Sequence, residues 1–150
     1  MTMFQSMNTT ASALTAQRLR MDIISSNMAN VDTTRGKYVD GEWVPYQRKM
    51  VVMQPEEADF SSFLHKAMGK EASTGQGVKV TKILNDETPA KLVYNPEHPD
   101  ADAEGYVAMP NVDPLRETVD YMSATRSYEA NVTVYNAAKS MMLKALEIGK

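Results

Sequence analysis

Cysteine is absent from this 150-residue chain. Its absence excludes disulfides, thiolate metal sites and cysteine nucleophiles. Long apolar runs are missing too, and none approaches the roughly 18 residues of a membrane-spanning helix. The 16 Lys and Arg residues do not outnumber the 19 Asp and Glu residues. Because no basic excess is available to neutralise phosphates, we do not expect nucleic-acid binding. Because no apolar run is long enough, we do not expect direct membrane insertion either.

Glycine and proline are almost missing from both ends of the chain. All seven prolines lie between Pro45 and Pro114, and six of the seven glycines lie between Gly36 and Gly105. Since both residues interrupt helices, the ends are predicted to be long helices. The predicted domains are an N-terminal helix of an inner helical domain over 1–35, a central β-rich and loop region over 36–112, and the C-terminal helix of the inner domain over 113–150.

The N-terminal segment carries a stripe of mostly apolar residues spaced alternately by four and three. This spacing is typical of the a and d positions of a coiled coil. Many Ser, Thr and Asn residues lower the helix propensity, so this helix should be firm only against a partner. The stripe, here called the N-terminal seam, consists of Met3, Met7, Thr10, Leu14, Gln17, Met21, Ile24, Met28 and Val31.

The C-terminal segment shows the same spacing. Asp113 is a candidate N-cap, Pro114 suits the first helical position, and Gly149 could end the helix. A second apolar row, Val134, Ala137, Met141 and Ile148, widens the apolar face. The main stripe, here called the C-terminal seam, consists of Tyr121, Ala124, Tyr128, Asn131, Tyr135, Ala138, Met142 and Ala145.

These stripes have two interpretations. A helical hairpin could bury its own core, or the pair could expose a broad apolar face and associate with other chains. Between the helices, short strands are expected around Val39 to Met53 and over 78–84, 91–94 and 106–109. A short helix over 60–68 and a flexible loop over 71–77 complete the predicted elements. The expected fold class is mainly α with a small β part.

Candidate chemistry is sparse. Asp100, Asp102 and Glu104 match the first half of a calcium loop, but Asn111 stands where the bidentate Glu should be. The two histidines, His65 and His98, have no recognisable partner motif. We therefore predict no catalytic, cofactor-binding or metal-binding residues, and an assembly or binding protein rather than an enzyme. An enzyme would need a site built from Asp100, Asp102 and His98.

Two motifs at opposite ends of the chain resemble those of bacterial flagellar rod and hook proteins. Residues 26–34, Ser-Asn-Met-Ala-Asn-Val-Asp-Thr-Thr, are similar to S-N-L-A-N-x-x-T, and residues 123–131, Ser-Ala-Thr-Arg-Ser-Tyr-Glu-Ala-Asn, to S-A-x-R-x-Y-x-A-N. The wider motif continues T-P-G-Y, whereas Thr34-Arg35-Gly36 stands here. The motif residues carried over are Asn27, Ala29, Asn30, Thr33, Arg126, Tyr128 and Asn131.

Further stretches resemble the C-type proteins of the proximal rod. These are Pro45-Tyr46-Gln47-Arg48-Lys49, the run 91–96, the run 101–107 and the run 109–113. The resemblance implies paired terminal helices and a subunit that polymerises helically into the hollow, torque-transmitting rod of the flagellar basal body. It also implies export through the flagellar type III apparatus without a cleaved signal, to an extracytoplasmic, periplasmic position.

Implied partners are further copies of the chain, the other proximal-rod proteins, the rod–export-gate junction protein, the distal-rod proteins and the export apparatus. A non-flagellar coiled-coil adaptor or secreted partner-binding protein is the alternative. Asn27, Asn30 and Asn131 could fix helix register, or the first two could simply end the first helix. The expected assembly interface consists of Met7, Leu14, Met21 and Met28 against Tyr121, Tyr128, Tyr135, Ala138 and Met142.

Overall fold

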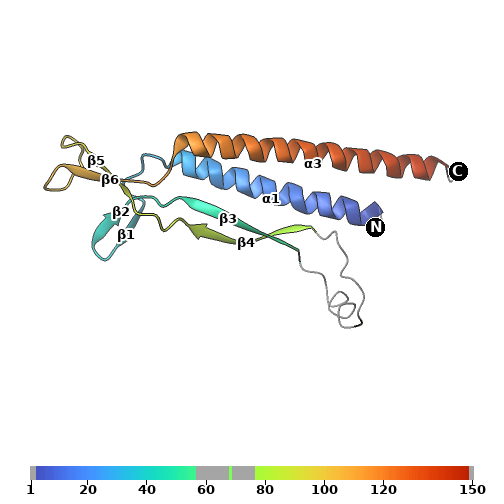
Figure 1. The fold of residues 1–150 in the computed structure, drawn as a ribbon, viewed down its shortest axis with the longest axis horizontal. Helices are drawn as coiled ribbons and strands as arrows, with labels where there is room; N and C mark the ends of the chain where they lie inside the picture. Colours follow the sequence, from blue (N-terminus) through green and yellow to red (C-terminus); the bar gives the residue numbers. More distant parts are fainter. Residues whose placement is uncertain (1–2, 57–67, 69–76, 149–150) are drawn as a thin grey trace. The chain divides into compact units, whose positions relative to one another are not determined.

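The computed structural model describes residues 3–56, 68 and 77–148 (Figure 1). Along the chain, one long helix precedes a group of short strands and a second long helix follows it. This confirms the predicted mainly-α class with a small β part. The predicted 60–68 helix and 71–77 loop lie almost wholly outside the described residues. The elements are α1 (Met3–Ala29), β1 (Lys37–Val39), β2 (Glu42–Val44), β3 (Lys49–Pro55), β4 (Val78–Asn85), β5 (Lys91–Tyr94), β6 (Tyr106–Met109) and α3 (Pro114–Ile148).

The chain divides into two compact units. Unit 1 comprises Met1–Leu19, Val52–Lys82 and Ala124–Lys150, and unit 2 comprises Arg20–Val51 and Ile83–Ser123. Each long helix therefore contributes its longer part to unit 1 and its shorter part to unit 2. The predicted domains are continuous stretches of the chain, whereas these units are groups of segments in contact. The predicted boundaries at 35/36 and 112/113 therefore stay predictions.

The helix ends follow from local hydrogen bonding. The Leu115 amide donates to Asp113 Oδ1 at 3.0 Å, and Pro114 is the first residue of α3, which confirms the predicted N-cap. This contact satisfies one of the amides that a helix leaves unpaired at its start. At the other junction α1 ends at Ala29, where Asn30 Nδ2 donates to the Ser26 carbonyl at 2.8 Å. Val31, the last position of the N-terminal seam, therefore lies beyond the helix.

The strands form three two-stranded sheets, β1–β2, β3–β4 and β5–β6. The pairs β1–β2 and β5–β6 are antiparallel. In the first hairpin Lys37 faces Val44 and Tyr38 faces Trp43. Its turn residues, Asp40 and Gly41, both have positive φ, as a two-residue type I′ turn requires. The predicted strands around Val39 to Met53 and over 78–84, 91–94 and 106–109 are thus confirmed.

Each unit has a small core. In unit 1 the start of β4 is seated on α1, because the Val78 amide donates to Ser12 Oγ at 3.0 Å. A Cβ on Gly77 would lie 2.0 Å from the same oxygen, so only glycine fits there. The buried residues of unit 1 include Thr10, Ala16, Ala124 and Ala138, and those of unit 2 include Ile23, Ile24, Asn27, Arg48, Val107, Val112 and Glu117.

Candidate assembly site

The N-terminal seam is only partly buried. Its members Thr10 and Ile24 are buried, Met7, Leu14 and Met21 are half-buried, and Met28 is 39% exposed. The neighbouring Ile23 and Asn27 are buried as well. A strict 3.5-residue repeat drifts by about 20° per heptad on a straight helix, so toward the C-terminal end of the stripe the buried face includes residues beside it.

The C-terminal seam, on α3, is also only partly buried. Ala138 is buried, Tyr128, Tyr135 and Met142 are half-buried, and Tyr121 is 39% exposed. Seam residues of both helices thus keep apolar surface that a single chain does not cover. Their part in assembly stays a prediction.

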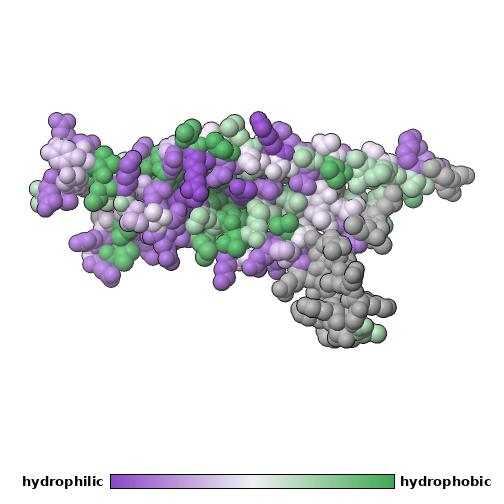
Figure 2. Space-filling model, in the orientation of Figure 1, coloured by the Kyte–Doolittle hydropathy of each residue, from purple (hydrophilic) through white to green (hydrophobic). Residues whose placement is uncertain are grey.

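A second apolar row of α3 faces solvent. Val134 is 55% exposed, Met141 is 57% exposed, and Ala137 between them is exposed. These three residues lie on one face because they are spaced by three and four. We call them the α3 outer row. On the face shown in Figure 2, hydrophobic surface (green) is interspersed with hydrophilic surface (purple).

Unit 2 contains a buried polar cluster of four side chains, Asn27, Tyr46, Arg48 and Glu117. Asn27 Nδ2 donates to the Lys49 carbonyl at 2.9 Å and to Glu117 Oε2 at 3.1 Å. Asn27 Oδ1 accepts from Tyr46 Oη at 2.9 Å and from the Lys49 amide at 2.9 Å. The amide thus uses both donor hydrogens and both acceptor positions. The cluster ties α1, α3 and the start of β3 together.

Arg48 supplies the positive charge of the polar cluster. Glu117 has a fully buried side chain, and Arg48 Nε donates to its Oε1 at 2.6 Å. Two further carboxylates lie within ion-pair range of Arg48, Asp86 at 3.8 Å and Asp120 at 3.5 Å. A buried carboxylate is stable only when it is paired and hydrogen-bonded, which this arrangement provides.

The motif asparagines differ in what they contact. The hydrogen-bond partners of Asn27 lie in α3 and β3, and its role in helix register stays a prediction. Asn30 ends the helix, and its Oδ1 accepts a hydrogen bond from Thr33 Oγ1 at 3.2 Å. Asn131 donates within α3 to the Ser127 carbonyl at 2.8 Å. Ala29 and Arg126 are exposed, and within the described residues Arg126 forms no ion pair.

Sequence reasoning singled out Asn27 but missed the roles of Tyr46, Arg48 and Glu117. The only available signal was the resemblance of residues 45–49 to a rod-protein stretch. Nothing local indicates that Arg48 and Glu117 meet, because 69 positions separate them in the chain.

The acidic residues of the candidate calcium loop have other partners. Arg35 Nε donates to Asp100 Oδ1 at 2.7 Å, and Thr34 Oγ1 donates to its Oδ2 at 2.7 Å. Asp102 Oδ1 accepts from the Glu104 and Tyr106 amides, each at 2.9 Å. These carboxylates therefore stabilise the connection between β5 and β6. Within the described residues no three His, Asp or Glu side chains gather as metal ligands.

The hydrogen bonds that Asp100 accepts hold the pKa of its carboxyl group below the ordinary value. The contribution of Arg35 is the largest, and that of Thr34 is the next. A depressed pKa in the folded state adds stability above the unfolded pKa of about 3.9, and this stability is lost as pH falls through the folded value. We therefore expect Asp100→Asn to show a smaller drop in urea midpoint between pH 7 and pH 3 than the unmodified chain. Glu104→Gln in the same loop is the control. Equal drops for all three proteins would contradict this assignment.

Comparison with known proteins bears on both ends of the chain and on its middle. The family "Flagella basal body rod protein" matches residues 7–37, and "Flagellar basal body rod FlgEFG protein C-terminal" matches residues 103–148. The flagellar basal-body rod protein FlgC of Bacillus subtilis (strain 168) is 62% identical over 150 residues, covering 100% of both chains. The chain belongs to the FlgC-type flagellar rod protein family.

More distant FlgC proteins match over nearly the same span. That of Escherichia coli O6:H1 is 50% identical over 139 residues, with 93% of this chain and 92% of the relative covered. That of Borreliella burgdorferi is 44% identical over 155 residues, with 99% and 98% covered. Membership of this rod protein family gives the chain a structural role in the flagellar basal body. No described helix is long and apolar enough to cross a membrane.

Within the rod protein family match, the N-terminal segment contains Asn27, Asn30 and Thr33, and the C-terminal segment contains Arg126, Tyr128 and Asn131. The C-terminal segment also contains Glu117, whereas Tyr46 and Arg48 lie in neither matched segment. The polar cluster thus joins the two family segments through residues from the middle of the chain.

Proposed function

We propose that this rod protein polymerises helically through its terminal helices and so forms part of the hollow, torque-transmitting shaft of the proximal rod. The observation that carries the proposal is the α3 outer row. Val134 and Met141 are more than half exposed. An apolar face of this kind on a long helix favours association with another helix.

The half-buried seam residues support the same mechanism. In this proposal Met7, Leu14 and Met21 of α1, with Tyr128 and Tyr135 of α3, pack within one chain and complete their burial against neighbouring copies. Met28, Tyr121, Ala138 and Met142 extend the same interface. The buried polar cluster keeps the two helices in register while they do so, because a misaligned pair would leave Glu117 uncompensated.

Export and location follow from the proposed place in the rod. The chain passes through the flagellar type III apparatus without a cleaved signal and assembles outside the cytoplasm. Its neighbours are other proximal-rod proteins, distal-rod proteins and the rod–export-gate junction protein. In this scheme the chain has no catalytic activity. The family match over the whole chain favours this function over a coiled-coil adaptor.

The function is tested by deleting the gene in its host and viewing isolated basal bodies by electron microscopy. We expect rings that lack rod and hook, and no swimming, because the shaft cannot extend past a missing subunit. The gene supplied in trans should restore both. Intact rods and swimming cells in the deletion strain, with no second copy of the gene, would contradict the proposal.

A further inference from the structure

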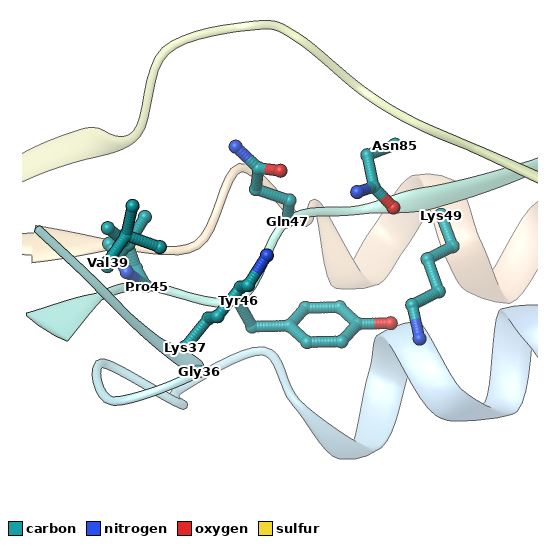
Figure 3. A pocket seen from close by; sticks show the side chains of 9 residues that line it. Gly36, Lys37, Val39, Pro45, Tyr46, Gln47, Lys49 and Asn85 are labelled. Carbon is teal, nitrogen blue, oxygen red and sulfur yellow. The ribbon is translucent and has the colours of Figure 1, made fainter.

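Unit 2 contains an open basic cleft of about 400 Å³ (Figure 3). Two lysines, Lys37 and Lys49, contribute positive charge, and Gln47 and Asn85 contribute side-chain amides. The Lys49 ammonium lies 5.6 Å from the centre of the Tyr46 ring. The residues that line this basic cleft are Gly36, Lys37, Val39, Val44, Pro45, Tyr46, Gln47, Lys49 and Asn85.

The described lining of the basic cleft carries positive charge only. No carboxylate is among the described residues that line it, and Glu42, which is paired with Val39 on the hairpin, forms no ion pair with Lys37. Both lysines are exposed, and within the described part of the chain Lys37 has no ion-pair partner. A cleft with two ammonium groups, two amides and apolar walls suits an exposed peptide segment that carries carboxylates.

The same chain carries such a segment between β5 and β6. Residues 92–115 contain five acidic residues and no Lys or Arg. Of these, Asp100 is bound by Thr34 and Arg35, and Asp102 accepts amides of the connection itself. Glu97 and Glu104 are exposed and form no ion pair within the described residues. The connection 95–105, here called the acidic loop, is closed by a hydrogen bond from the Asn95 amide to the Gly105 carbonyl at 2.9 Å.

The acidic loop and the basic cleft lie on opposite faces of the β1–β2 hairpin. Side chains alternate along a strand, so Lys37, Val39, Glu42 and Val44 share one face and Tyr38 and Trp43 share the other. Lys37, Val39 and Val44 of the first face line the basic cleft. On the other face Trp43 lines a depression with Asp100 and Ala101 of the acidic loop. The chain's own loop is therefore directed away from its own cleft.

We propose that the acidic loop of one copy binds in the basic cleft of the next copy, with Glu97 and Glu104 facing Lys37 and Lys49. Because the two surfaces lie on opposite faces, the contact is head-to-tail and does not close into a two-fold dimer. The loop binds at low entropic cost because its internal hydrogen bonds already order it. This contact rests on the proposed polymerisation and adds a specific ionic link to it.

Cross-linking tests the contact, since the chain has no cysteine of its own. The variant Gln47→Cys, Ala103→Cys places one thiol in the cleft and one in the loop without changing any charge. Gln54→Cys, Ala103→Cys is the control, because Gln54 is exposed and outside the cleft. Each variant replaces the chromosomal gene, and isolated basal bodies are treated with a short bis-maleimide.

We expect the first variant to give a ladder of covalent multimers of this chain, at least tenfold above the control. Motile cells without cross-links, a product that stops at the dimer, or a cross-link to a different protein would each overturn the contact while leaving the proposed rod function intact. Swimming of each variant strain is measured as well, because swimming shows that the variant chain still forms rods. If Glu97→Lys, Glu104→Lys abolishes swimming and Lys37→Glu, Lys49→Glu in the same chain restores it, the pairing is supported independently.

Discussion

Replacing Arg48 with methionine is expected to lower the free energy of unfolding by about 3–5 kcal/mol, the usual cost of breaking a buried ion pair from one side. The reason is Glu117, whose side chain is completely buried and whose Oε1 accepts from Arg48 Nε at 2.6 Å. Methionine fills a similar volume but leaves this carboxylate without a cation. Urea unfolding followed by circular dichroism measures the loss.

Two matched variants separate this effect from simple loss of a charge. Arg20→Met removes a guanidinium that lies 3.6 Å from Asp120 and is 35% exposed, and it should cost less than about 1 kcal/mol. Arg48→Met, Glu117→Met removes both charges and should recover most of the lost stability. If the double variant were as unstable as Arg48→Met alone, the ion pair would not be the cause.

The second large effect concerns association rather than folding. Val134→Glu, Met141→Glu is expected to abolish swimming and rod formation while the isolated chain keeps its unfolding midpoint. Both side chains are more than half exposed, and exposed substitutions usually change stability by less than about 0.5 kcal/mol. A carboxylate buried at a subunit contact costs several kcal/mol, and about 3 kcal/mol per contact already weakens association roughly hundredfold.

Asn136→Glu is the control for this experiment. It adds the same charge at an exposed position of α3 that lies well away from the outer row. Swimming should persist in this variant, and electron microscopy of basal bodies should show normal rods. Normal rods in the Val134→Glu, Met141→Glu strain would show that the outer row is not an assembly surface.

Local sequence predicted the secondary structure well. The helices were marked by the absence of glycine and proline, and the start of α3 by Asp113 and Pro114, because these signals act within one turn. Alternation predicted β4, and short apolar stretches predicted β5 and β6. Chain order could not give the two compact units, which each draw on both ends of the chain.

The candidate site was harder to predict. The stripe spacing located the half-buried Met7, Leu14 and Met21, but which copy covers their remaining surface depends on packing that no single sequence specifies. The polar cluster depends on Tyr46 and Arg48 meeting residues of both helices. Such pairings are tertiary, and a buried Glu in a helix gives the same local pattern as an exposed one until its partner is placed.

Gly77 lies close to Ser12 of α1, and this contact has a consequence for the ends of β3 and β4. The Glu56 amide donates to the Gly77 carbonyl at 2.7 Å, so these two residues are held next to each other within unit 1. Closing a connection across such a fixed gap costs only about 0.6 kcal/mol for each doubling of its length. The hydrogen bond between Glu56 and Gly77, with that from the Val78 amide to Ser12 Oγ, therefore fixes the end of β3 beside the start of β4 whatever the number of residues that joins them.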